Sequence, residues 1–179
     1  MRRWLILVAG ATLSAQSPKY GIGRAPAPSE LRGWNTSISP EGEGLPDERG
    51  TAFEARETYA SRCARCHGDK GQGRDSVALA GGQGSLASAK PLRTVGSYWP
   101  YATTVWDYVN RAMPFDRPGT LTSSQVYSLT AYILYLNGIV KENEVMDAHT
   151  LPRVQMPNRK GFVADPRPDV PLRGESLRH

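Results

Sequence analysis

The sequence predicts a mainly α-helical domain with long proline-rich extensions at both ends. Two stretches, Thr51-Ala52-Phe53-Glu54 and Thr122-Ser123-Ser124-Gln125, have the capping-box form that begins a helix. Apolar residues recur at helical spacing between Thr51 and Val140. Each flank holds five prolines, which favour extended backbone over a packed core. We therefore expect one domain over residues 51–140, an extended arm over 16–50 and a second arm over 141–179.

The first expected helix, from Thr51, leads into Cys63-Ala64-Arg65-Cys66-His67. This C-x-x-C-H run attaches a c-type haem: two closely spaced thiols reach the two vinyl groups, and the next residue places an imidazole below the iron. A thioredoxin-like C-x-x-C belongs in a βαβ pattern, and no apolar strand precedes Cys63. A closed zinc site needs four ligands, whereas the chain has only two cysteines and three histidines at unsuitable spacing. One motif predicts one covalently bound haem, with His67 as an iron ligand.

The expected inward stripe of the first helix contains Phe53, Tyr59, Ala60 and Cys63. The glycine-rich stretch after His67 matches neither a P-loop nor a dinucleotide fingerprint. We expect these glycines to let the backbone turn sharply close to the haem. A backbone carbonyl of this stretch should accept a hydrogen bond from the nitrogen of His67 that does not bind iron.

A second helix is expected to begin with Thr103 or Thr104 as N-cap, because Thr104-Val105-Trp106-Asp107 fits a capping box. The helix should end at Ala112, with Trp106 packed on the haem. Pro114 then ends the helix and holds Met113 in an extended loop. A thioether opposite an imidazole is the ligand pair that raises the reduction potential of cytochromes c, so Met113 is the predicted second iron ligand. Met156 and Met146 are the competing thioethers, and both lie in the proline-rich flank.

The last helix should run from the Thr122 cap to Asn137-Gly138. Its predicted buried stripe packs against the first helix, near Ala55, and its tyrosines are expected along the edges of that stripe. The stripe contains Val126, Leu129, Ile133 and Leu136, and the tyrosines are Tyr127, Tyr132 and Tyr135.

The N-terminus predicts export. Met1-Arg2-Arg3 is a short basic region, and an apolar run of about ten residues follows it, which fits a signal peptide over residues 1–15. The run is too short for a membrane-spanning helix, although an uncleaved N-terminal anchor is the alternative. The net charge is +5, and the basic residues of the tail alternate with prolines and acids, which does not favour nucleic acid as a partner.

The order of these elements resembles a class I cytochrome c domain. Three segments more specifically resemble the cytochrome subunits of sulfite and sulfane dehydrogenases (SoxD-like): Thr94–Thr104, Arg111–Phe115 and Leu134–Ile139. The segment Met156-Pro157-Asn158-Arg159 is similar to that family as well. Many family members carry a proline before the paired glycines, where this chain has Val77–Gly82.

This resemblance implies a periplasmic, non-catalytic electron-transfer subunit. Its partner would be a molybdenum-cofactor subunit that oxidises sulfite or carrier-bound sulfane sulfur, and its acceptor a soluble cytochrome c. No acid/base pair or nucleophile constellation appears in the sequence, which agrees with a relay. The alternatives are a free-standing electron carrier and, as a second alternative, a ligand-binding haem sensor or peroxidase. A shuttle needs only the compact domain, and Met113 disfavours ligand binding.

Both proline-rich arms are expected to lie along the molybdenum subunit. Proline-rich chain is already extended, so ordering it on a surface costs little entropy. The expected anchors are the large apolar residues scattered through the arms, Trp34, Leu151, Val154, Met156, Phe162 and Val170. The alternative is that the tails pack on their own haem domain.

Overall fold

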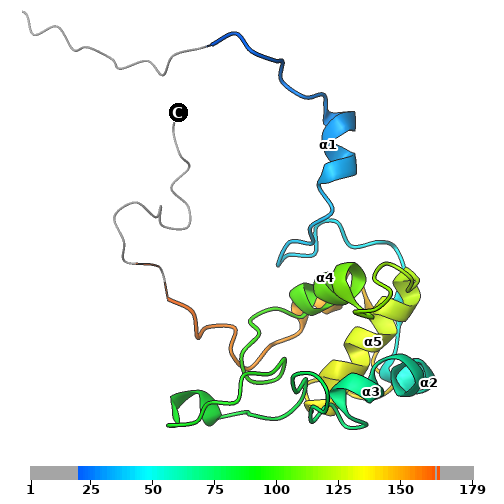
Figure 1. Ribbon diagram of the computed structural model, residues 1–179, viewed down its shortest axis with the longest axis vertical. Coiled ribbons are helices and arrows are strands. Elements are labelled where there is room, and N and C mark those ends of the chain that lie inside the picture. The colour runs from blue at the N-terminus through cyan, green and yellow to red at the C-terminus, as the bar shows by residue number, and fades with distance from the viewer. Residues whose placement is uncertain (1–19, 164, 166–179) are drawn as a thin grey trace, which may run out of the picture. The chain divides into compact units, whose positions relative to one another are not determined.

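The computed structural model of the chain describes residues 20–163 and 165 (Figure 1). The chain separates into two compact units, with the boundary between Asn35 and Thr36. The predicted signal peptide, residues 1–15, lies outside the described residues, and so does Val170. Among the described residues, no helix has the length and apolar character needed to cross a bilayer.

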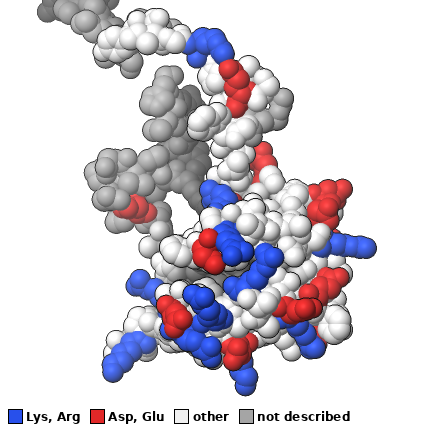
Figure 2. Space-filling view, turned by 45° about the vertical axis from the view of Figure 1, so that its right-hand side comes forward, with Lys and Arg blue, Asp and Glu red and all other residues white. Residues whose placement is uncertain are grey.

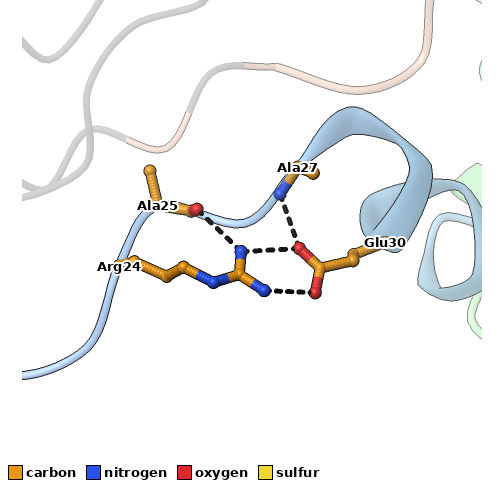
Figure 3. Close-up of polar contacts among 4 residues, drawn as sticks. All are labelled: Arg24, Ala25, Ala27 and Glu30. Carbon is orange, nitrogen blue, oxygen red and sulfur yellow. Dashed lines mark hydrogen bonds and ion pairs between the residues drawn. The ribbon is translucent and has the colours of Figure 1, made fainter.

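The described part of the first unit contains one short helix, α1 (Pro28–Trp34), which the proline content had not predicted. Proline at the first helical position sets the required backbone angle, and Glu30 Oε2 accepts from the Ala27 N–H at 2.7 Å. Arg24 then donates from Nη1 to Glu30 Oε2 at 2.8 Å and from Nη2 to Glu30 Oε1 at 2.6 Å (Figure 3). These exposed contacts fix the beginning of a helix that buries none of its described side chains.

The second unit begins its helical core with α2 (Ala52–Arg62), whose predicted capping box is confirmed. Thr51 Oγ1 accepts from Glu54 N at 3.4 Å, and Glu54 Oε2 accepts from Thr51 N at 2.7 Å. The predicted inward stripe is only partly right. Tyr59 is buried, but Phe53 and Ala60 are exposed, and the buried face instead contains Ala52 and Ala55. Small residues on this face let the backbone of α2 approach α5 closely.

Helix α5 (Ser123–Leu136) forms the centre of the unit, and its capping box from Thr122 to Gln125 is also confirmed. It packs against α2, as predicted, and against α4 (Figure 1). Tyr127 was expected at an edge but is fully buried, because its ring lies 5.4 Å from that of Trp106 and its hydroxyl donates to Pro46 O at 2.9 Å. Tyr132 is half-buried and Tyr135 is 37% exposed, as expected for edge positions.

Helix α4 (Ala102–Ala112) begins earlier than predicted. Its N-cap is Tyr101, whose side chain does not cap the helix, so the expected box starting at Thr104 is wrong. Asp107, the acid of that expected box, is buried and forms an ion pair with Arg111 one turn later. The helix ends at Ala112, as predicted, before Pro114.

Two short strands, β1 (Arg49–Gly50) and β2 (Met146–Asp147), pair antiparallel and bring the segment after Val140 back onto the core. A 3-10 helix, η2 (Leu151–Arg153), follows. The anchors Leu151, Val154 and Met156, expected to contact another subunit, instead belong to the core of their own domain. Individual apolar side chains in a proline-rich segment can therefore fill a core although the segment forms only short elements.

Charges of both signs are intermixed over the face of the molecule that Figure 2 shows. The surface ion pairs of the described residues include Arg56 with Glu142 and Arg74 with Asp69. Such pairs contribute little to stability individually. On the face drawn in Figure 2, the intermixed charges break up the field that a basic patch for nucleic acid would require.

Candidate haem site

The C-x-x-C-H motif lies where α2 ends and α3 (Ala64–His67) begins. Cys63 caps both helices, and its carbonyl accepts from the N–H groups of Cys66 (3.1 Å) and His67 (2.9 Å). This tight turn brings both thiols and the imidazole together on about one helical turn. Both thiols are free and half-buried, and burial raises the pKa of Cys63 to about 11, so that thiol is protonated at neutral pH.

The orientation of the His67 ring is fixed by the backbone of the loop that follows. His67 Nδ1 lies 2.8 Å from the carbonyl oxygen of Val77. Because a carbonyl only accepts, Nδ1 carries the proton and donates it, which leaves the lone pair of Nε2 for a metal. The prediction that a carbonyl of this loop holds His67 is confirmed.

The loop returns toward the motif because glycines adopt conformations that other residues avoid. Gly68, Gly71 and Gly73 have φ angles of 80°, 69° and 88°. The Gly73 N–H then donates to His67 O at 2.7 Å, closing the first turn of the loop. The expected role of these glycines in sharp turning is confirmed.

Tyr59 attaches the beginning of this loop to α2. Its hydroxyl donates to the carbonyl of Gly68 at 2.9 Å, and its side chain is 1% exposed. Burial holds the pKa of the phenol above its usual range, so it remains a donor. The sequence indicated only core packing for Tyr59, because nothing local reveals a contact to a backbone carbonyl.

Met113 follows the last residue of α4 with extended backbone, φ −122° and ψ 149°. Its side chain is half-buried against the core, whereas Met146 and Met156 are 1% and 3% exposed inside it. A thioether enclosed by protein atoms is not free to bind a metal. Burial therefore favours Met113 among the described methionines, although its role as a ligand stays a prediction.

The residues present fit a covalently attached haem. Two free thiols, an imidazole with Nε2 available and a half-buried thioether form the donor set that a haem c requires. Half-buried apolar side chains also border the core and could cover a macrocycle; they include Leu79, Trp99, Leu121 and Leu136. Trp106, expected on the haem, is 2% exposed, and its indole N–H has no hydrogen-bond partner among the described residues.

Comparison with known proteins agrees with this site. The family described as cytochrome c oxidase, cbb3-type, subunit III matches residues 50–133. The crystal structure of the sulfane dehydrogenase SoxCD from Paracoccus pantotrophus contains a chain with 43% sequence identity and a TM-score of 0.75. The match covers 83% of this chain and 74% of the other. No curated protein sequence matches.

The chain belongs to the SoxD-like family of cytochrome c subunits. It is therefore a cytochrome subunit for electron transfer, and its cytochrome c domain implies haem c. Two of the SoxD-like segments lie together in the structure. Asn158 Nδ2 donates to Tyr98 O at 2.8 Å, and the Arg159 guanidinium lies 5.1 Å from the centre of the Tyr101 ring. These contacts hold the segment from Met156 to Arg159 on the loop that precedes α4.

Proposed function

We propose that this chain is the monohaem electron-transfer subunit of a periplasmic sulfane dehydrogenase. The observation that carries this proposal is the 43% identity to a chain of the SoxCD structure over 83% of the present sequence. The subunit accepts electrons from a molybdenum-containing partner that oxidises sulfane sulfur. It passes them singly to a soluble cytochrome c. Haem c, when bound, supplies the one-electron chemistry.

In this proposal, each residue of the site has one role. Cys63 and Cys66 would attach the haem covalently, and His67 and Met113 would bind its iron. An iron bound by both side chains would have no place left for substrate or oxygen, which suits a relay. The Val77 carbonyl, 2.8 Å from His67 Nδ1, supports this assignment because it orients Nε2 for the metal.

The ligand assignment is tested by replacing the methionines of the haem-loaded protein. The ferric wild type should be low-spin and show the weak near-infrared band of sulfur-to-iron charge transfer. Met113→Ala should remove that band and lower the midpoint potential by roughly 100 mV or more, since axial ligands set the potential over about 0.8 V. Met156→Leu is the matched control, because it removes a thioether but preserves core volume. Loss of the band in Met156→Leu and its retention in Met113→Ala would overturn the assignment.

We also propose that residues 20–35 bind the molybdenum subunit. Four large apolar side chains of this segment are strongly exposed: Tyr20 by 79%, Ile22 by 91%, Leu31 by 49% and Trp34 by 87%. Leu31 and Trp34 are three positions apart on α1, so they lie on one face of a helix whose beginning Arg24 and Glu30 already fix. A preformed amphipathic turn with a tryptophan suits binding in a groove of a partner protein.

The test is co-purification of the tagged, full-length cytochrome with the molybdenum subunit. Leu31→Ser with Trp34→Ser should reduce recovery of the partner at unchanged haem content. Phe53→Ser is the control, because Phe53 is 57% exposed but lies on α2. Full recovery with the double variant would refute this contact. A wild-type protein that purifies without the molybdenum subunit, and that exchanges electrons as well without this subunit as with it, would instead identify a free carrier.

Export and domain boundaries complete the proposal. We propose that residues 1–15 are removed on export, and that the haem domain of residues 51–140 is completed by the core residues Met146, Leu151, Val154 and Met156 of the segment after Val140. Mass spectrometry of the periplasmic fraction should find a haem-loaded chain that begins at Gln16. A chain that retains Met1 would indicate the uncleaved anchor.

A further inference from the structure

Asn137, the residue that ends α5, makes more side-chain contacts with the loop after His67 than a helix cap requires. Its Nδ2 donates to Leu79 O at 3.0 Å and to Ile133 O at 2.8 Å. Its Oδ1 accepts from Gly81 N at 3.1 Å. Both amide protons and the oxygen are thus satisfied, which only this orientation of the amide allows. Through these bonds the end of α5 holds residues 79–81 in place.

The loop held in this way is the one that orients His67. Val77, whose carbonyl accepts from His67 Nδ1, precedes Leu79 by two residues. Leu79 N also donates to Gly71 O at 2.7 Å, so the two sides of the loop are joined there. Any displacement of Leu79 is therefore transmitted to the Val77 carbonyl over at most about 7 Å of chain.

Further contacts support the same part of the loop. Gln83 Nε2 donates to Asn137 O at 3.0 Å, and Thr94 Oγ1 donates to Gly81 O at 2.6 Å. Asn137 also lies directly against the backbone of Gly96, where an added Cβ would come within 2.0 Å of Asn137 Oδ1. The absence of a side chain at position 96 therefore makes room for the amide.

We propose that Asn137 is a positioning residue for His67. By holding residues 79–81 against α5, it sets the place of the Val77 carbonyl and hence the direction and basicity of the imidazole. This inference rests on the proposed role of His67 as an axial ligand. A ligand that donates a firm hydrogen bond is more basic and stabilises the oxidised metal, so weakening that bond raises the reduction potential.

Two independent variants of the full-length, haem-loaded protein test the proposal. Asn137→Ala removes the amide, and Gly96→Ala displaces it without changing its chemistry. Both should raise the midpoint potential and alter the haem-methyl hyperfine shifts of the ferric protein, which report the plane of the axial imidazole. The His67 ring N–H should exchange with solvent about tenfold faster, since one hydrogen bond is weakened.

Val126→Ala is the matched control for lost stability. Val126 is fully buried at the opposite end of α5, roughly 16 Å along the helix from Asn137, so its truncation destabilises the fold without touching the loop. Unchanged potential, shifts and exchange in Gly96→Ala and in a folded Asn137→Ala would overturn the inference, as would equal changes in Val126→Ala. A wild-type ferric protein without a low-spin spectrum would instead show that the proposed axial ligation is wrong.

Discussion

Gly50 lies closely against α5, and replacing it gives a direct test of the packing. It precedes the N-cap of α2 and pairs with Met146. A Cβ at this position would lie 2.1 Å from Ser128 Oγ, 2.6 Å from Ser128 N and 2.9 Å from Ser124 O. The hydroxyl can rotate away, but the other two atoms belong to the backbone of α5. Gly50→Ala should therefore force β1 and α5 apart and cost about 1–3 kcal/mol.

Thermal unfolding of the haem-loaded protein, followed by circular dichroism, measures this cost. A loss of about 2 kcal/mol lowers the Tm of a domain of this size by on the order of 10 °C. Adding Ser128→Ala removes only the movable contact, so it should restore less than half of the loss. Gly33→Ala is the control, because a Cβ there meets no atom within 4 Å. A Gly50→Ala protein with unchanged Tm would refute the close approach.

Two further substitutions probe the same domain. Ala55 is 1% exposed on the face of α2 that meets α5, so Ala55→Leu should cost about 1–3 kcal/mol in thermal unfolding; Ala60→Leu, on the exposed side of α2, should leave Tm nearly unchanged. The backbone hydrogen bond from Thr150 N, and after it that from His149 N, lowers the pKa of Asp147 from its ordinary value of 3.8. The ionised carboxylate therefore stabilises the fold fully above pH 3.8, and this stabilisation is lost as the pH falls through the lowered pKa. Asp147→Asn should therefore flatten the acid limb of stability against pH, and an acid limb as steep as that of the wild type would contradict this.

The parts of the fold that the sequence predicted well depend on local contacts. Thr51 and Thr122 each cap a helix through a residue three positions later, so both halves of the signal are adjacent in sequence. The same reasoning failed for α4, because its true N-cap, Tyr101, carries no capping group. Asp107, the apparent capping acid, pairs with Arg111 instead, and only the folded structure decides between these two uses of one carboxylate.

In the candidate site, too, the local features could be predicted from the sequence and the long-range contacts could not. The C-x-x-C-H motif specifies three adjacent groups by their chemistry, and residue type alone identifies them. Which carbonyl holds His67 depends on how the loop folds, since every residue offers a carbonyl. Asn137 lies 70 positions from His67 in the sequence, and its amide reaches the loop only because α5 packs beside it. Contacts of this kind have no periodic or spacing signal.

The segment after Val140 contributes to the core, which limits where the chain can be truncated to test contact with a partner. Met146, Leu151, Val154 and Met156 are at most 9% exposed and share the core of the helices. Truncating a single buried Leu or Met to Ala costs about 2–5 kcal/mol, and a whole domain is stable by only about 5–15 kcal/mol.

A chain that ends at Val140 should therefore fail to fold, and its loss of a partner would say nothing about binding. A chain that ends at Val163 keeps all four core residues and the contact between Phe162 and Tyr98, whose ring centres lie 5.3 Å apart. We expect the longer chain to retain helical circular dichroism and its haem, and the shorter chain to lose both. A cooperative unfolding transition in the chain that ends at Val140 would show that these four side chains are dispensable to the core, and the segment from 141 to 156 would again be available as an arm for the partner.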